Sequence, residues 1–402
     1  MNYIKSALKE ILQLCGGELR KIFTDGGVML LLFGATLIYP LIYSFAYAPE
    51  VLQETPVALV NQDNSKHTRE LKRMLDATPE IDITQETGSL QEAELSFYEG
   101  DVAGIILIPE DFTSNLYQKE AAHLAVYADA SYMMLYKQVY QAAARTSQTL
   151  GKKIEVKKRL AKGTPKEAAI NKANPVAYRS HGLFNPQGGY GSYAMPAILV
   201  LILQQTLLLG IGMRGGTDRE LGAPHYLLPK KASLRGALRI IFSKTMAYLL
   251  LYIPISFYLF VVIMRWFQFP QAGNSFDLFI FSIPLILASI MLGFLFTTFF
   301  KNRENSMIFL LFTSVPLIFL SGFSWPVESF PLGFEALSHL FPSSAGITGL
   351  LKISVMGGDI RTAMPQFLEL WIMVFALFII NWIIVRVKMD KLQSRPASAE
   401  QT

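Results

Sequence analysis

Residues 194–213 read AMPAILVLILQQTLLLGIGM, an uninterrupted run without a charged side chain. An α-helix rises about 1.5 Å per residue, so about 20 such residues cross a hydrocarbon core of about 30 Å. Charged residues make up 17% of the whole chain, against roughly 25% in soluble domains. Five further stretches resemble the first: 27–47, 245–264, 278–299, 306–323 and 367–386. The sequence therefore predicts an α-helical integral membrane protein with six transmembrane helices.

The first of these stretches, 27–47, is followed closely by a sequence that resembles a signal-peptidase site, Ala46-Tyr47-Ala48. Signal peptides carry apolar cores of roughly 7–15 residues behind a short basic segment. The apolar core in this chain is longer and starts only after residue 26. We therefore expect a membrane anchor that is retained.

Lysine and arginine residues gather in the connection 214–244, in the short connection 300–305 and in the tail 387–402. Segments with this bias face the cytoplasm in multi-spanning proteins. Both termini are therefore expected in the cytoplasm. The segments expected on the outer side are 48–193, 265–277 and 324–366. A net charge of +5 alone would also fit nucleic acid, but this distribution favours the membrane, and we expect no nucleic-acid partner.

Two segments are predicted to form helices that do not cross the membrane. Residues 1–26 repeat apolar side chains at helical spacing, from Ile4 to Ile22, with lysines and arginines elsewhere around the helix. Such a helix suits the cytoplasmic membrane interface, although a core-packing helix has the same pattern. The outer segment 324–366 holds apolar stretches that are too short to cross and are broken by prolines. It is expected to be re-entrant or interfacial and to pack against protein.

The outer segment 48–193 is mostly polar and long enough for one domain. Strand patterns alternate in it with helical patterns, which predicts an α/β extracytoplasmic domain. The predicted strands are 56–61, 81–84, 102–108 and 124–127, and the predicted helices are 65–77, 89–99, 110–118 and an extension over 131–173. The extension carries seven lysines and arginines between Lys152 and Lys166. This basic run fits a solvated helix face, and contact with anionic headgroups or an acidic partner is the alternative.

One span, a large outer domain and five further spans form the layout of a known family, and three motifs agree with it. The motifs are Val57-Ala58-Leu59-Val60-Asn61-Gln62-Asp63-Asn64-Ser65, the stretch from Glu99 to Phe112 that contains Ile108-Pro109, and Ser321-Gly322-Phe323-Ser324-Trp325-Pro326. Together they resemble the type-2 ABC transporter permeases, which are the transmembrane subunits of ABC exporters. Each motif also has a purely structural interpretation, and Asp63-Asn64-Ser65 in particular has the chemistry of a turn and a helix N-cap.

The resemblance implies a separate cytoplasmic ABC ATPase that binds ATP and Mg²⁺, with no cofactor in this chain. It also implies that the connection 214–244 docks on that ATPase. The residues that match the family's coupling segment are Arg219, Glu220, Leu227, Pro229 and Lys244. Gly222-Ala223-Pro224 stands where the family usually has Gly-Thr, so this sequence departs from the family in its docking segment. The alternative function of these charges is to fix the orientation of the spans.

Sequence motifs for catalysis and metal binding are absent. The chain has no Gly-x-x-x-x-Gly-Lys-Ser/Thr, Gly-x-Ser-x-Gly or His-Glu-x-x-His motif, and its single cysteine, Cys15, cannot form an intrachain disulfide. We therefore predict no catalytic residue and no metal site.

Polar residues inside the predicted spans are candidates for a substrate path, although hydrogen bonding between helices is their commoner role. They are Gln204, Gln205, Thr206, Thr313, Ser314 and Asn381. The predicted spans hold essentially no interior carboxylate, which disfavours an ion-coupled carrier.

These observations predict the permease subunit of an ATP-driven exporter in the bacterial inner membrane. A dimer with a second copy or a related permease is expected, in contact with membrane lipids and with a possible periplasmic adaptor. The low charge of the spans suits an amphipathic, lipid-like or drug-like substrate. The alternative function is that of a non-transporting envelope protein whose outer domain binds a partner, a phage or a cell-wall component.

Overall fold

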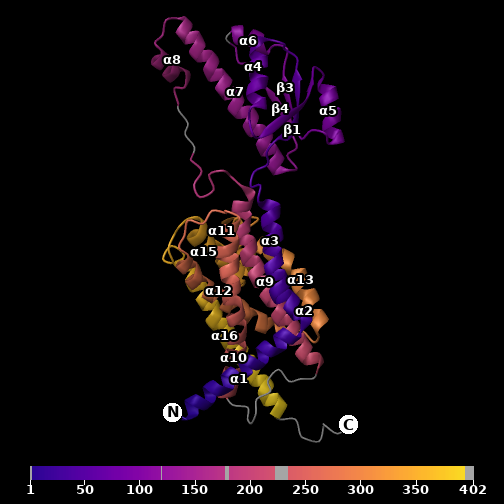
Figure 1. Ribbon diagram of the computed structural model, residues 1–402, viewed down its shortest axis with the longest axis vertical. Helices are drawn as coiled ribbons and strands as arrows, with labels where there is room; N and C mark the ends of the chain where they lie inside the picture. The colour runs from indigo at the N-terminus through magenta and orange to yellow at the C-terminus, as the bar shows by residue number, and fades with distance from the viewer. Residues whose placement is uncertain (1, 119, 177–180, 222–233, 394–402) are drawn as a thin grey trace. The chain divides into compact units, whose positions relative to one another are not determined.

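The computed structural model describes residues 2–118, 120–176, 181–221 and 234–393, and the chain divides into two compact units (Figure 1). The first, called the membrane unit, consists of Met1–Glu50 and Gly182–Thr402. The second, called the α/β unit, is Val51–His181.

The α/β unit is built on a four-stranded sheet in the order β2-β1-β3-β4. β1 pairs in parallel with both β2 and β3, and β4 runs antiparallel to β3. The strands are β1 (Thr55–Asn61), β2 (Ile81–Thr87), β3 (Gly104–Ile108) and β4 (Ala125–Ala128). The helices are α4 (Lys66–Asp76), α5 (Leu90–Glu99), α6 (Phe112–Gln118), α7 (Met133–Ala161) and α8 (Lys166–Ala173). All four predicted strands and the predicted α/β class are confirmed.

Both faces of the central strand β1 are buried, which explains its continuous apolar sequence. Val57 and Leu59 pack on one face, in the cluster that contains residues of α4 and α7. Ala58 and Val60 point to the opposite face, where they pack with Ala93 of α5. Successive side chains of a strand alternate between faces, so one strand supports two hydrophobic layers.

The turn after β1 ties two helices together through side-chain caps. Ser65 Oγ accepts hydrogen bonds from the amides of His67 and Thr68 at the start of α4. Asp63 Oδ2 accepts a hydrogen bond of 2.8 Å from the amide of Thr113 in the first turn of α6. The predicted turn and N-cap chemistry of this segment is confirmed.

Replacement of Ser65 by alanine is expected to lower the free energy of unfolding of the α/β unit by about 1 kcal/mol, because the first amides of α4 lose their acceptor. Hydrogen–deuterium exchange of α4 in the full-length protein measures the loss. Asn64→Ala, at an exposed position of the same turn, serves as the control. Equal exchange in both variants would contradict the capping role.

Within the described residues, six helical segments are long and apolar enough to cross a membrane. They are Gly26–Tyr47, Tyr190–Glu220, Gly236–Trp266, Ser275–Thr297, Arg303–Leu320 and Met364–Met389. Each overlaps one predicted stretch, so the six predicted spans are confirmed. The elements that form them are α2 (Gly26–Met29), η1 (Leu30–Ala35), α3 (Thr36–Tyr47), α9 (Tyr190–Glu220), α10 (Leu234–Phe257), η2 (Tyr258–Ile263), α11 (Met264–Trp266), α12 (Ser275–Thr297), α13 (Arg303–Leu320) and α16 (Met364–Gln393).

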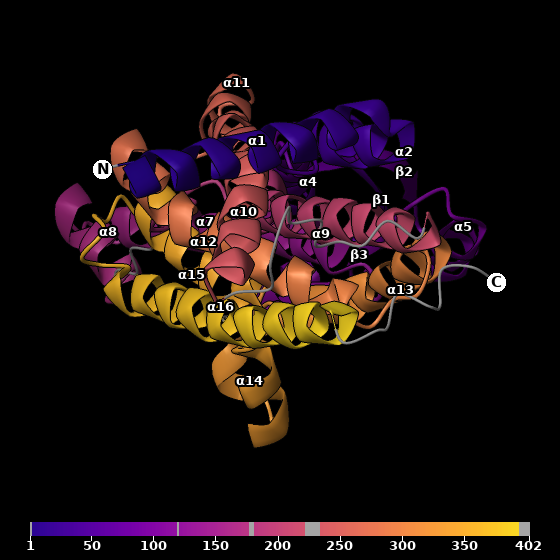
Figure 2. The same cartoon turned by 90° about the horizontal axis from the view of Figure 1, so that it is seen from below.

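Helix α9 lies at the centre of the membrane unit, and 89% of its most apolar 18-residue stretch is buried. It contacts α3, α12, α13 and α15. Small residues on α9 allow this close packing. A Cβ atom on Gly210, for example, would lie 2.2 Å from the Leu32 side chain. The helix α1 (Asn2–Thr24) crosses one end of the unit, and α1 and α16 lie on opposite sides of α10 (Figure 2).

The segment predicted to be re-entrant contains short helices rather than a span. They are η3 (Val327–Ser329), α14 (Leu332–Ser338), α15 (Pro342–Leu350) and η4 (Leu351–Val355). Helix α15 is buried along most of its length, and Gly349 lies directly against the Phe281 ring of α12. The segment is thus packed against protein, while its position in the membrane stays a prediction.

Irregular turns interrupt several of the apolar helices. Three of the described elements, η1, η2 and η4, have π-helical geometry. Proline lies in the interior of five of the six candidate spans, at positions 40, 196, 254, 284 and 316, and in the first turn of the sixth, at position 365. Proline has no amide hydrogen to donate, and the π-helical element η2 begins four residues after Pro254.

Candidate functional site

The basic connection predicted over 214–244 is shorter than expected at both ends. Helix α9 continues through Glu220, and α10 begins at Leu234. The loop prediction was therefore wrong for Arg219, Glu220 and Lys244, which lie in helices. Oppositely charged side chains four residues apart support a helix, and Arg214 pairs with Asp218 in this way. Two other predicted coupling residues, Leu227 and Pro229, lie outside the described residues.

The buried carboxylate of Asp218 lies close to basic side chains from three helices at this end of the membrane unit. Asp218 is 1% exposed. Its Oδ1 atom pairs with Arg214 of α9 and lies 3.3 Å from Lys21 Nζ of α1. Its Oδ2 atom lies 3.8 Å from Lys244 Nζ of α10.

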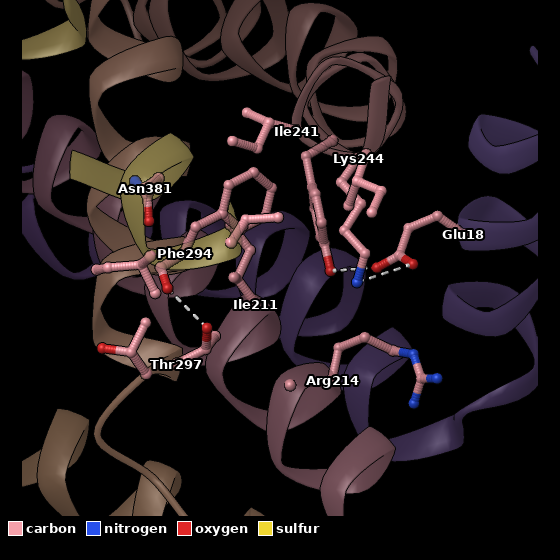
Figure 3. A pocket seen from close by; sticks show the side chains of 14 residues that line it. Glu18, Ile211, Arg214, Ile241, Lys244, Phe294, Thr297 and Asn381 are labelled. Atoms are coloured by element: carbon pink, nitrogen blue, oxygen red, sulfur yellow. Dashed lines mark hydrogen bonds and ion pairs between the residues drawn. The ribbon is translucent and has the colours of Figure 1, made fainter. Parts of the chain in front are cut away.

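A second buried carboxylate, that of Glu18 on α1, extends the network. Lys244 Nζ lies 3.5 Å from Glu18 Oε2, and the Tyr248 hydroxyl donates a hydrogen bond of 3.4 Å to Glu18 Oε1 (Figure 3). We call Glu18, Lys21, Arg214, Asp218 and Lys244 the charge network. An ion removed from water is costly unless it is paired, so the network holds α1, α9 and α10 together.

Further ion pairs surround the charge network. Arg239 of α10 pairs with Glu10 of α1. Arg303, the first residue of α13, pairs at 3.0 Å with Asp25, which caps α2. Glu220 Oε1 accepts a hydrogen bond of 2.7 Å from the Arg303 amide. A carboxylate is favourable at a helix N-terminus, so Glu220 anchors α9 to α13 whatever else it does.

A small cavity of about 50 Å³ borders the charge network. Glu18, Arg214 and Lys244 line it on one side, and Phe294 and Asn381 on another (Figure 3). A water molecule occupies about 30 Å³ in the liquid, whereas sites for drug-sized ligands measure roughly 300–1,000 Å³. The cavity therefore has room for water but not for a transported molecule.

The predicted substrate-path residues lie in different places in the membrane unit. Gln204 is fully buried and accepts a hydrogen bond of 2.7 Å from the Ser343 amide in α15. Asn381 donates to the Met291 carbonyl at 2.8 Å and thereby joins α16 to α12. Both make the contacts between helices that the commoner interpretation expects.

The hydroxyl groups among these candidates bond mainly within their own helices. Thr313 donates to the Phe309 carbonyl and Ser314 to the Leu311 carbonyl, both in α13. Thr206 donates to Ile202 and also accepts a hydrogen bond of 2.9 Å from Tyr252. Gln205 differs, since its side-chain amide finds no hydrogen-bond partner in the described part of the chain.

The sequence did not predict the charge-network residues on α1, because the apolar spacing of that helix indicates an amphipathic helix and not which of its acids are buried. Glu18 lies one turn from Cys15 and from Ile22, on the face that is buried. α1 thus packs against α10, as the core-packing alternative expects. Leu8 and Leu12 stay exposed, as a helix at a membrane interface requires.

Six apolar helices, with an α/β unit inserted between the first two, define a multi-pass membrane protein. Residues 27–383 match the model of the ABC-2 family transporter protein, and the chain belongs to this family. The chain is thus a transporter permease subunit, and the resemblance inferred from the motifs is confirmed.

Two relatives from Escherichia coli (strain K12) cover most of the chain. The probable multidrug ABC transporter permease YbhR is 22% identical over 326 residues, which are 81% of this chain and 84% of the relative. The probable multidrug ABC transporter permease YbhS is 21% identical over 366 residues, which are 87% of this chain and 89% of the relative.

Substitution by alanine is expected to destabilise the protein at one glycine and not at another. A Cβ atom on Gly216 would lie 2.5 Å from the Arg303 Cα atom, whereas one on Gly26 meets nothing within 4 Å. Gly216→Ala should cost about 1–3 kcal/mol by overpacking. Gly26→Ala should be neutral or stabilising, by up to about 1 kcal/mol. Thermal unfolding of the two purified variants measures both, and an equal midpoint would contradict the close α9–α13 contact.

Cys15 is expected to react slowly with maleimide at neutral pH. Burial, and to a lesser degree the Glu18 carboxylate, raise the pKa of its thiol. Because the thiolate is the reactive form, the labelling rate should rise as the pH approaches that raised pKa. Gln13→Cys in a Cys15→Ser background places the thiol at an exposed position of the same helix and should react much faster. Equal rates would mean that α1 does not bury this face.

Proposed function

We propose that this permease subunit works in an ATP-driven exporter, and that the charge network couples a cytoplasmic ABC ATPase to the membrane helices. Membership of the ABC-2 permease family implies such an ATPase partner. The observation that carries the coupling proposal is the burial of Glu18 and Asp218 between three helices. Two of these helices, α9 and α10, flank residues 222–233.

In this proposal, α1, the end of α9 and the start of α10 move as one body. Separation of the paired charges would leave ions in a medium of low dielectric constant, where an unpaired buried charge costs about 3–5 kcal/mol. A displacement applied to any one of the three helices is therefore passed to the other two. The state of the ATPase then selects between two arrangements by contacting them differently.

Helix α9 is the element that carries this displacement into the membrane. It contacts α12, α13 and α15 along its length. The Glu220 carboxylate links its last turn to the first turn of α13. The motion of the charged end would thus reach the helices that surround α9.

The orientation in the proposal follows from the distribution of basic residues. The charge network faces the cytoplasm together with both termini, and the α/β unit is extracytoplasmic in the bacterial inner membrane. Docking of Arg219, Glu220, Leu227, Pro229 and Lys244 on the ATPase belongs to the same proposal.

The proposed cargo is an amphipathic, drug-like or lipid-like molecule that moves outward. The relatives are described as probable multidrug permeases, which supports this class. Gln205 is the first residue that we would assign to the path, because both the nitrogen and the oxygen of its side-chain amide are unpartnered in the described chain. Gln204, Thr313, Ser314 and Asn381 complete the proposed path.

We also propose that a second permease, either another copy or a relative, binds beside this one. Helix α13 is the least buried of the six candidate spans, because only 17% of its 18-residue apolar stretch is buried. Phe312, Val315 and Phe319 are exposed on it. A second permease or lipid would cover these side chains, and a periplasmic adaptor is the further partner that we expect.

Charge exchange between Glu10 and Arg239 tests the coupling. Their side chains are 30% and 20% exposed, so a single reversal is less disruptive here than inside the charge network. Glu10→Arg and Arg239→Glu should each reduce ATP-driven ethidium transport about tenfold or more, because like charges then repel across the α1–α10 contact. The double variant should recover transport, since the pair is re-formed with exchanged partners.

The assay uses inverted membrane vesicles that contain the permease and its ATPase. Lys9→Glu makes the same charge change as Arg239→Glu at an exposed position of α1 and should leave transport unchanged. Co-purification of the ATPase with each variant separates loss of docking from loss of coupling. Full transport by both single variants would refute the coupling proposal.

A further inference from the structure

The α/β unit has an apolar cavity of about 330 Å³. Side chains from α4, α6, α7, β4 and the segment before β4 line it, with Phe112, Leu116, Leu150 and Ile154 among them. This volume falls within the range of roughly 300–1,000 Å³ that is typical of small-molecule sites. Most of its lining is apolar, so it suits the apolar part of a ligand.

A second cavity of about 460 Å³ adjoins the first and shares Leu116, Gly151 and Ile154 with it. Its remaining wall is charged and belongs mostly to the end of α7. The cations are Lys158, Arg159 and Lys162, and the carboxylates are Glu120 and Glu155. We call the two cavities together the α7 groove.

Cations are in excess in the polar part of the α7 groove. Glu155 pairs with Arg159 at 2.7 Å, which leaves Lys158 and Lys162 to face the single carboxylate of Glu120. Lys158 Nζ donates a hydrogen bond of 2.9 Å to the Leu116 carbonyl. This bond holds one positive charge at the boundary between the apolar and the charged parts.

The spacing of residues along α7 explains why the two parts are continuous. Leu150, Gly151, Ile154, Lys158 and Lys162 follow the spacing of three to four residues that marks one helix face. A Cβ atom on Gly151 would meet nothing within 4 Å. The helix therefore leaves open space where the apolar part joins the charged part.

We propose that the α7 groove binds an amphipathic anion, with an acyl chain in the apolar cavity and a carboxylate or phosphate head beside Lys158 and Lys162. A solvated helix face accounts for the lysines but not for the apolar cavity that continues from them. A membrane surface would contact the basic residues without filling that cavity. The inference is independent of the coupling proposal, because it concerns the unit that lacks the charge network.

The test uses the full-length protein in nanodiscs of phosphatidylcholine and a dodecanoate that carries a terminal diazirine. After irradiation, cross-links are located by mass spectrometry of peptides, with empty nanodiscs as background. We expect cross-links in α6 and in the Tyr140–Ile154 part of α7. Unlabelled dodecanoate and dodecyl phosphate should compete, and dodecyltrimethylammonium, with the opposite head charge, should not.

Two pairs of variants locate the site and keep the test independent of folding. Gly151→Leu fills the groove and should lower cross-linking about tenfold, while it also favours the helix. Gln148→Leu adds the same side chain at an exposed position of α7 outside the groove and should change nothing. Lys162→Glu should weaken binding about tenfold, whereas Lys152→Glu, outside the groove, should not.

Three results would overturn the proposal. Cross-links confined to the membrane helices would place the amphiphile elsewhere. Equal labelling of Gly151→Leu and the unchanged protein would show that the cavity is not used. Equal losses in Lys162→Glu and Lys152→Glu, together with binding to anionic vesicles that Gly151→Leu leaves intact, would assign the basic run to a membrane surface.

Discussion

The Asp218 carboxylate, buried at the end of the central helix, sets the arrangement of the membrane unit at that end. An ion out of water needs partners, and Asp218 finds them on α1, α9 and α10. Glu18 is a second buried carboxylate, on α1, and it shares Lys244 of α10 with Asp218. Asp218 is fully paired only when all three helices are in position, and Glu18 only when α1 lies against Lys244 and Tyr248 of α10, so the helix that crosses the end of the unit becomes part of its core.

Close packing and charge pairing depend on each other in this region. Gly216 allows the backbone of Arg303 to approach α9 directly, and this approach brings the Arg303 amide within reach of Glu220. The same arginine reaches Asp25, which caps α2. A bulky residue at position 216 would therefore lengthen ionic contacts that it does not touch.

The sequence predicts the apolar helices and the α/β sheet well, because both follow from periodicity within short windows. Val57 to Val60 form a continuous apolar run, and a strand covered on both faces requires one. The charge network could not be predicted in this way. Arg214 and Asp218 follow an apolar stretch and look like loop charges, and their burial depends on Glu18 and Lys21, which are almost 200 residues away. The α7 groove could not be predicted from the sequence either, because its cavities result from how α6 and α7 pack.

The π-helical elements η1 and η2, which lie inside candidate spans, allow a particular kind of helix movement. A π-helical turn contains one residue more than a regular turn. When such an extra residue migrates along a helix, the segment that it passes rotates by roughly 100° and advances by about 1.5 Å. The backbone ladder beyond it stays intact, and so do the helix ends. A helix such as that formed by α10, η2 and α11 can thus present different side chains to its neighbours by internal screw motion, without tilting as a rigid rod.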